Sequence, residues 1–380
     1  MLLPSGLFID QSKININMED LKYWLALGQF YKFGPVKFKK LQSYFPNMQS
    51  AFTAPLSELL QAGLDEKTAE EFIVFRHSQE PDKLLENLEK EKVKIVTIAD
   101  PAYPKLLKQI YDPPFIIYYR GHLDIFENYL LAVVGTRKYT DYGRQVTEKI
   151  VRDLVNAGLA TTSGLAYGID TLAHAATLEA GGQTAAVLAS GLDRQNIYPA
   201  QNRYLADKIE GQGGIILSEY PLGTMPLRHH FPQRNRLISG LSLATLVIEA
   251  GEKSGAVITA MHALEQNREV FAIPGSIYSA YSAGTNSLIK LGAKLVAGAS
   301  DIIESLNLAD AVNAMESKKI IPESTEEKLI LEHLNYEPRH VDEIKNLTKL
   351  DTSVINSTLT LMEMKGMIKN LGSMRYVLAR

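Results

Sequence analysis

Between residues 129 and 305, short continuous apolar runs alternate with amphipathic segments of helical length. Seven of the runs have the length of a buried strand. Parallel strands that are covered by helices on both faces are apolar throughout, so this rhythm predicts a doubly wound, mostly parallel α/β sheet. The runs are LLAVV (130–134), LATTS (159–163), TAAVLA (184–189), GIILS (214–218), ATLVIE (244–249), EVFAI (269–273) and AKLVA (293–297).

The residues before this region follow a helical period. Leu21, Trp24 and Leu25 open one amphipathic segment, and apolar residues recur at spacings of three and four up to about Asn87. We therefore predict a helical domain over residues 18–92. Its Gly-containing turns weakly resemble those of helix-hairpin-helix and SAM-like modules. Two roles stay open for it, direct contact with a nucleic-acid backbone and packing or partner binding.

Two β-type runs, VKIVTI (93–98) and PFIIYY (114–119), precede the alternating region and are expected to add edge strands to its sheet. We expect an α/β domain over residues 93–308 and a polar linker over 309–324. Three helical patterns and a hairpin that turns at Gly372 then predict a winged helix over 325–380. Its recognition segment, 353–365, has a single basic residue, so DNA reading and protein docking stay equally open for this domain.

Composition limits the classes of function. The chain has 380 residues, of which 46% are hydrophobic and 22% are charged, and its mean hydropathy is −0.08, so we expect two to three globular domains. It has no cysteine, which excludes disulfides, zinc-thiolate sites and thiol catalysis. We expect neither a signal peptide nor a membrane span, and a cytoplasmic location. The net charge of −3 means that any nucleic-acid affinity must come from a local cationic patch.

Two glycine-containing loops follow the first two predicted strands of the alternating region. In GTRKYTDYG (135–143), Gly135 permits a sharp turn and Arg137 stands near the start of a helix. In SGLAYGID (163–170), Ser163 and Gly164 offer a hydroxyl and bare backbone N–H groups. Both loops predict anion sites at helix N-termini. Neither is a dinucleotide fingerprint or a Walker loop, so no nucleotide cofactor is expected.

The segment PLRHHFPQRNRLISGLS (226–242) is the most informative one. Within it, Arg228, Arg234 and Arg236 surround Phe231, and no acidic residue lies among them. Guanidinium groups can meet phosphates while the aromatic ring stacks on a base, which suits a single strand. The alternative is an ordinary solvated surface loop. A metal site at the neighbouring histidines is not expected, because adjacent residues point apart.

The loop after the fifth run, within EAGEKSGAVITAMHALEQ (249–266), places Ser254 and Gly255 before a helix and is a third candidate phosphate cradle. Glu249 and Glu252 are the only carboxylates here with a position suited to a general base.

Taken together, these motifs resemble the DNA-processing protein A (DprA/Smf) family. The resemblance runs from about Pro104 to Ala297, and the flanks fit members with a SAM-like domain and a winged helix. The motifs, in order, are GTRKYTDYG, SGLAYGIDTLAHAATL, GLDRQNIYPAQN, SEYPLGTMPLRHHFPQRNRLISGLS, EAGEKSGAVITA, FAIPGS and GTNSLIKLGA.

The resemblance implies a Rossmann-like homodimer that binds and protects single-stranded DNA and helps to load the RecA recombinase during natural transformation, without catalysis or cofactor. It places seven residues in the family's DNA pocket, in addition to Arg137: Ser163, Gly164, Arg228, Phe231, Arg234, Asn235 and Arg236. Gly135, Ser254 and Gly255 join this predicted site from the loop arguments above.

The alternative function is enzymatic, because the same superfamily contains phosphoribohydrolase-like nucleotide-processing enzymes with a P-G-G-x-G-T-x-x-E loop. Here Glu249 and Ala250 stand where that signature has Pro-Gly. When Gly255 is aligned with its last Gly, Thr259 falls at the position of the catalytic Glu. The sequence therefore favours a DNA-binding function over an enzymatic one.

Overall fold

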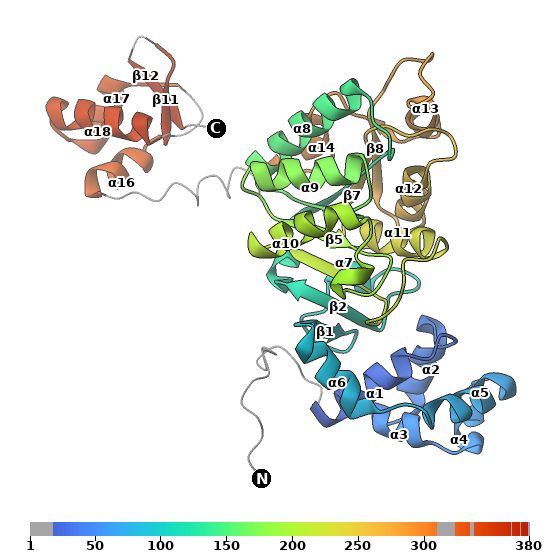
Figure 1. Cartoon of the computed structure of the whole chain (residues 1–380). Coiled ribbons are helices and arrows are strands. Elements are labelled where there is room, and N and C mark those ends of the chain that lie inside the picture. The colour runs from blue at the N-terminus through green and yellow to red at the C-terminus, as the bar shows by residue number, and fades with distance from the viewer. Residues whose placement is uncertain (1–17, 310–323, 335–337, 366, 373, 379–380) are drawn as a thin grey trace. The chain divides into compact units, whose positions relative to one another are not determined.

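A nine-stranded, mostly parallel sheet forms the core of the α/β region in the computed structural model (Figure 1). The structure describes residues 18–309, 324–334, 338–365, 367–372 and 374–378. The strand order is β1-β2-β6-β5-β4-β3-β7-β8-β9. The bounds are β1 Lys94–Thr97, β2 Ile116–Gly121, β3 Leu130–Val134, β4 Ala160–Ser163, β5 Thr184–Val187, β6 Ile215–Ser218, β7 Ala244–Val247, β8 Glu269–Ala272 and β9 Lys294–Leu295. All seven predicted strands of the alternating region are present, and the α/β fold class is confirmed.

The strands β3 to β9 pair in parallel, whereas β1 and β2 pair antiparallel at one edge of the sheet. The prediction that the two β-type runs before the alternating region add edge strands to the sheet is therefore confirmed. From β3 the chain moves outward to β4, β5 and β6, and it then crosses back to β7, which pairs with the other side of β3. The order of the strands thus reverses between β4 and β7, and this is the position where open α/β sheets bind ligands.

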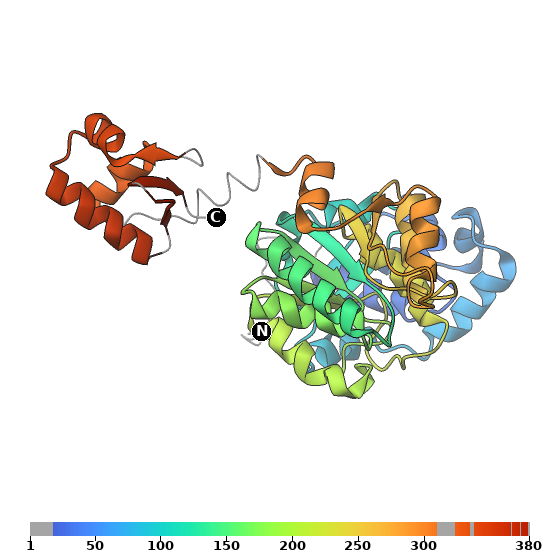
Figure 2. The same ribbon diagram turned by 90° about the horizontal axis from the view of Figure 1, so that it is seen from above.

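Helices cover both faces of the sheet (Figure 2). The first layer contains α8 (Asp141–Asn156), α9 (Ile169–Glu179) and α10 (Arg203–Gly211), which pack on one another in succession. The second layer follows the crossover and contains α11 (His230–Gly240), α12 (Gly255–Glu265) and α13 (Ala283–Lys290), with α7 (Lys105–Lys108) beside α11. The remaining helices are η2 Leu123–Glu127, η3 Arg194–Asn196, η4 Ala200–Asn202 and α14 Ala299–Ser305.

Six helices form the N-terminal module, which packs on the sheet at its β1–β2 edge (Figure 1). One continuous core joins the module to this edge, and the rings of Phe38 and Phe115 stack across the boundary at 3.7 Å between centroids. The predicted helical character is therefore confirmed. The helices are α1 Met18–Gly28, α2 Pro35–Tyr44, α3 Met48–Thr53, α4 Leu56–Gln61, α5 Glu66–Arg76 and α6 Pro81–Lys90.

Residues Ile303–Arg380 form a separate compact unit. A three-stranded antiparallel sheet in the order β10-β12-β11 packs there against three helices around a core that contains Ile344 and Leu359. The hairpin of β11 and β12 turns at Gly372 as predicted, and the unit is a winged helix. The bounds are α16 Thr325–Leu331, β10 Arg339–His340, α17 Val341–Thr348, α18 Thr352–Met364, β11 Ile368–Asn370 and β12 Arg375–Leu378. The predicted linker, 309–324, lies almost entirely outside the described residues.

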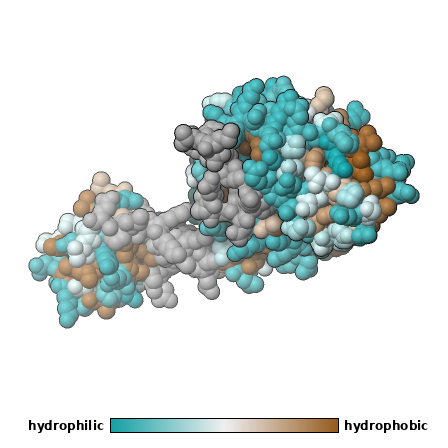
Figure 3. Space-filling model, turned by 90° about the horizontal axis from the view of Figure 1, so that it is seen from below, coloured by the Kyte–Doolittle hydropathy of each residue, from teal (hydrophilic) through white to brown (hydrophobic). Residues whose placement is uncertain are grey.

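Hydrophilic and hydrophobic residues are interspersed over the face of the molecule that Figure 3 presents. Among the described residues, none of the helices combines the length and the apolar character that crossing a membrane requires.

Candidate nucleic-acid interface

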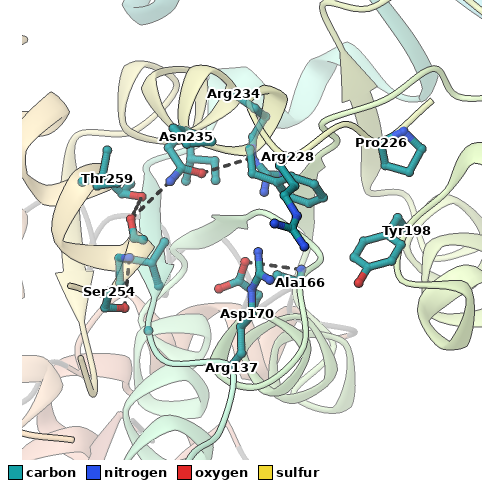
Figure 4. A pocket seen from close by; sticks show the side chains of 18 residues that line it. Arg137, Ala166, Asp170, Tyr198, Pro226, Arg228, Arg234, Asn235, Ser254 and Thr259 are labelled. Atoms are coloured by element: carbon teal, nitrogen blue, oxygen red, sulfur yellow. Dashed lines mark hydrogen bonds between the residues drawn. The ribbon is translucent and has the colours of Figure 1, made fainter. Parts of the chain in front are cut away.

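A pocket of about 760 Å³ opens where the order of the strands reverses, and we call it the switch-point pocket. Its walls come from the loops after β3, β4 and β7 and from α11. Figure 4 shows the side chains of Arg137, Arg228 and Tyr198 around one open space, with Asn235 and Ser254 on the opposite side. The pocket therefore combines loops that lie far apart in the sequence.

The Phe231 ring lies at the centre of a cluster of cations and aromatic rings. The guanidinium carbons of Arg137 and Arg234 lie 5.4 Å and 5.9 Å from the ring centroid. Tyr198 meets the same ring edge to face, with 5.7 Å between centroids. Phe231 is half-buried and Arg137 is exposed, so the ring is fixed by its neighbours and still lines the pocket. Such a ring offers a stacking surface beside a positive charge.

Arg234 lies in the floor of the pocket, where only 3% of the residue is exposed. Its guanidinium donates to the backbone carbonyls of Val187 and Gly164, the second at 2.8 Å, and its Nε donates to Asn235 Oδ1 at 3.3 Å. Burial lowers the pKa of Arg234 to about 10, and the nearby carboxylate of Asp170 opposes the shift. Arg234 remains charged at neutral pH and links the backbone after β4 to the end of β5 in the floor of the pocket.

Asp170 is the buried carboxylate that accompanies this arginine. It accepts the backbone N–H groups of Gly164 at 3.1 Å and of Ala166 at 3.4 Å. Burial raises the pKa of Asp170, while Arg234 and these backbone N–H groups oppose the rise. The carboxylate therefore shapes the loop after β4 around the floor of the pocket.

Two glycines are required by close contacts in the loop after β4. A Cβ at Gly164 would lie 2.6 Å from Arg234 Nη2 and 2.8 Å from Asp170 Oδ2. Gly168, the N-cap of α9, has φ +86°, and a Cβ there would lie 2.2 Å from the carbonyl oxygen of Thr136. Only glycine fits this left-handed position beside another backbone.

The N-terminus of α12 forms the opposite wall. Ser254 caps this helix by accepting the N–H of Ala256 at 3.3 Å. The Asn235 amide donates to the carbonyl of Gly255 at 3.2 Å and so ties α11 to this helix. Free N–H groups at a helix N-terminus favour an anion, and Ser254 and Gly255, the candidate phosphate cradle, line the pocket.

Eight of the eleven predicted site residues line the switch-point pocket. They are Gly135, Arg137, Arg228, Phe231, Arg234, Asn235, Ser254 and Gly255. Two others lie behind its wall. Ser163 is fully buried and its hydroxyl donates to the carbonyl of Val133 at 2.7 Å, whereas Gly164 offers its carbonyl to Arg234.

Arg236 is the predicted residue that the structure does not bring to the pocket. Its side chain leaves the opposite side of α11, where the guanidinium contacts the carboxylate of Glu219 and lies 3.1 Å from that of Asp112. The physical reason is helical geometry. The segment that carries the cations continues as a helix from His230, and residues two positions apart on a helix point in very different directions.

The candidate general bases lie outside the pocket lining. Glu249 is 2% exposed, and its carboxylate accepts the hydroxyl and the backbone N–H of Thr140 at 2.6 Å and 3.0 Å. It therefore anchors the start of α8. Thr259, at the position of the enzymes' acid, lines the pocket and donates to the carbonyl of Gly255. Within the described residues, no group of three His, Cys, Asp or Glu side chains is placed to hold a metal.

Tyr198 and Asp170 line the pocket but were absent from the predicted site. Both stand in segments that carry the family resemblance, GLDRQNIYPAQN and SGLAYGIDTLAHAATL. Arg234 also points to Asp170, because a cation that is buried in the fold requires a negative charge beside it. For Tyr198 the signal is weaker, since its ring reaches Phe231 only through the tertiary fold.

Comparisons with known proteins find similar sequences that cover most of the chain. Residues 94–307 match the family described as DNA recombination-mediator protein A, and residues 316–373 match the DprA winged helix domain. Protein Smf of Synechocystis is 37% identical across 93% of this chain and 98% of its own length. The DNA processing protein DprA of Bacillus subtilis is 43% identical across 59% of this chain and 75% of its own length.

Two solved structures are similar to the chain. The structure of DNA processing protein A from Streptococcus pneumoniae has a TM-score of 0.64 and 35% identity, over 74% of this chain and 97% of that one. The Helicobacter pylori protein has a TM-score of 0.51 and 30% identity, over 57% of this chain and 95% of that one. The structure of the Helicobacter protein is described as showing a unique mode of binding single-stranded DNA.

Proposed function

The chain belongs to the DNA-processing protein A (DprA/Smf) family, and from this premise we propose that its switch-point pocket binds single-stranded DNA. The observation that carries the proposal is the half-buried Phe231 ring, whose centroid lies 5.4 Å and 5.9 Å from the guanidinium carbons of Arg137 and Arg234. An unstacked base can reach this ring, whereas a duplex hides its bases. The Helicobacter pylori relative, whose structure is described as binding single-stranded DNA, supports the same ligand.

Charge supports a role for phosphates as well. Arg137 and Arg228 are exposed at the pocket, and the N-terminus of α12 adds backbone N–H groups. If the two exposed arginines each neutralise one phosphate, the logarithm of the binding constant falls with the logarithm of salt concentration with a slope of about −1.4, from ~0.7 per phosphate for single strands.

A competition assay tests the proposal. The full chain is titrated with fluorescent oligo-dT, which is then displaced by unlabelled single strand or by duplex of the same length. We expect single strand to compete better than duplex and different base compositions to compete about equally. Equal competition by duplex would contradict the proposal.

We further propose that the protein protects incoming single strands and helps to load the RecA recombinase on them in the cytoplasm, as the family resemblance implies for natural transformation and recombination. The test uses single-stranded DNA coated with single-strand-binding protein, with RecA added. The full chain should shorten the lag before RecA hydrolyses ATP. An unchanged lag across a concentration series of the chain would argue against loading.

We propose that the working form is a homodimer. Two apolar side chains of α12, Met261 and Leu264, are exposed about one helical turn apart and support a protein contact there. Analytical ultracentrifugation of the full chain should show a dimer, and Leu264→Glu should shift the equilibrium towards the monomer. A monomer at all concentrations would contradict the proposal.

We propose that the pocket acts without catalysis. The enzyme alternative requires a carboxylate that is free to act on a substrate, whereas Asp170 accepts two backbone N–H groups and lies beside the charge of Arg234. Incubation with nucleoside monophosphates should release no free base. Release that Asp170→Asn abolishes would favour the phosphoribohydrolase-like alternative.

The domain boundaries are proposals of the same kind: helical residues 18–92, an α/β domain over 93–308, a linker over 309–324 and a winged helix over 325–380. Brief digestion with a nonspecific protease should cut first within 309–324. A first cut inside the α/β domain would contradict this division.

A further inference from the structure

A second pocket, of about 580 Å³, lies between the helical module and the α/β domain, and we call it the module cleft. Gln29 and Tyr31, from the turn after α1, line one side of it. Tyr220, from the loop after β6, and His229, just before α11, line the other side. The cleft therefore exists only where the two parts of the chain pack together.

Helix α11 separates the two pockets, because its residues line one pocket on one side and the other pocket on the other side. Phe231 and Arg234 line the switch-point pocket, whereas His230 and Gln233 line the module cleft. At the rim, Arg228 belongs to the first pocket and the next residue, His229, belongs to the second. Since consecutive Cα atoms are about 3.8 Å apart, the linings of the two pockets meet at this point of the backbone.

The side chains of the module cleft suit bases better than phosphates. The ring of Tyr31 is 82% exposed, and the rings of Tyr220 and His230 stack at 4.2 Å between centroids. Arg236, the cation of the cleft, is already occupied by the carboxylates of Glu219 and Asp112. Aromatic rings without a surplus of positive charge offer stacking surfaces for bases.

Four buried polar atoms in the walls of the cleft have no hydrogen-bond partner among the described residues. They are the hydroxyl of Tyr118, Oε1 of Glu219, Nδ1 of His230 and Nη1 of Arg236. A buried polar group without a partner is unfavourable, because it has lost its hydrogen bonds to water and gained none. The edge of a nucleobase carries donors and acceptors side by side, so a base that widens the cleft slightly can pair with both the carboxylate and the guanidinium.

A third pocket, of about 860 Å³, neighbours the cleft and shares Pro35 and Phe115 with it. Lys39 and Lys108 line this third pocket and are exposed, and the Tyr111 ring beside them is 94% exposed. The third pocket therefore carries positive charge beside the exposed ring of Tyr111. Phosphates of a strand that has passed through the cleft would meet these two lysines.

We infer that one single strand of DNA runs from the switch-point pocket across Arg228 and His229 into the module cleft, stacks its bases on Tyr31 and Tyr220, and leaves past Lys39 and Lys108. This inference rests on the proposed function and extends it by naming the helical module as part of the path. Short strands fill the first pocket alone, and only longer strands reach the cleft.

The test compares two lengths of oligo-dT on the full chain, one of about six nucleotides and one of about 20, chosen around the ~4–16 nucleotides that comparable sites span. Tyr31→Ala should weaken binding of the long oligonucleotide by about fivefold or more, which corresponds to ~1 kcal/mol of stacking, and leave the short one unchanged. Tyr31→Phe should restore the long-strand affinity. Tyr204→Ala is the matched control, because Tyr204 is 67% exposed and lines neither pocket.

The lysines give a second readout. Lys39→Ala and Lys108→Ala should each make the salt slope for the long oligonucleotide shallower by about 0.7 and leave the slope for the short one unchanged. If Arg137→Ala weakens both lengths while the tyrosine and lysine variants bind both lengths like the unmodified chain, the inferred path is wrong and the proposed function stands. If Arg137→Ala affects neither length, the proposed function itself fails. Equal weakening of both lengths by Tyr31→Ala would also overturn the inferred order of contacts.

Discussion

Arg137 lies in the loop after β3 and Phe231 lies on α11, and the arginine guanidinium carbon lies 5.4 Å from the centroid of the phenylalanine ring. The arginine follows β3, which pairs with both β4 and β7, whereas the phenylalanine lies in the first turn of α11, after the crossover. This contact places a positive charge that can bind a phosphate beside a ring that can stack on a base. The two side chains make different contributions to binding, and these can be measured separately.

Replacing Arg137 by alanine should weaken binding of single-stranded DNA at every sequence. The salt slope should become shallower by about 0.7, because one phosphate neutralisation is removed. Fluorescence anisotropy titrations at several salt concentrations measure both effects. Arg152→Ala is the control, because Arg152 is also exposed but does not line the pocket. An unchanged slope for Arg137→Ala would show that this guanidinium does not contact the backbone of the strand.

Replacing Phe231 by alanine should cost about 1–3 kcal/mol of binding free energy, because a stacking surface is lost. The salt slope should stay unchanged, since no charge is removed. Phe231→Leu separates stacking from filling of space and should bind nearly as weakly as the alanine variant. Circular dichroism melts check that both variants fold. Full affinity in a folded Phe231→Leu variant would mean that no base stacks on this ring.

Arg234→Ala should act mainly on stability. The buried guanidinium donates to the carbonyls of Gly164 and Val187 and offsets the charge of Asp170. Its loss should lower the free energy of unfolding by at least about 2 kcal/mol, because two buried carbonyls lose a donor. Urea denaturation measures this change. At a temperature where the variant is folded, its salt slope should match that of the unmodified chain, and a slope shallower by about 0.7 would instead assign a phosphate to Arg234.

His174 should make stability depend on pH. It is fully buried, its Nδ1 lies 2.7 Å from Thr184 Oγ1, and burial, together with the charge of Arg234, lowers its pKa from 6.5 to about 3. Below pH 6.5 the unfolded chain binds a proton at this residue that the folded chain does not bind. This contribution to stability is therefore complete above pH 6.5 and is lost progressively as the pH falls from 6.5 towards 3.

Between pH 7 and pH 5 the loss should be about 2 kcal/mol, from ~1.4 kcal/mol per pH unit below the unfolded pKa. Urea denaturation at the two pH values measures it. His174→Gln is the comparison, and its free energy of unfolding should change less over the same interval. Identical changes in both proteins would show that His174 does not titrate in this way.

The sequence alone determined the strands and the loops that end them. The seven apolar runs became β3 to β9, and the glycine-containing loops lie beside helix starts at Gly168 and Ser254. These features follow from local rules, because a strand buried on both faces must be apolar and a tight turn beside another backbone requires glycine. The hairpin at Gly372 and the edge strands β1 and β2 could be predicted on similar grounds.

Tertiary structure decided the direction of each side chain in the site. Arg234 and Arg236 belong to the same cationic run in the sequence, but the packing of α11 on the sheet turns the first into the floor of the pocket and the second towards Glu219. Ser163 donates its hydroxyl to the neighbouring strand, a bond that exists only once β3 and β4 pair. Composition and spacing record which chemistry is present in a segment, whereas the face that a helix buries depends on residues far away in the chain.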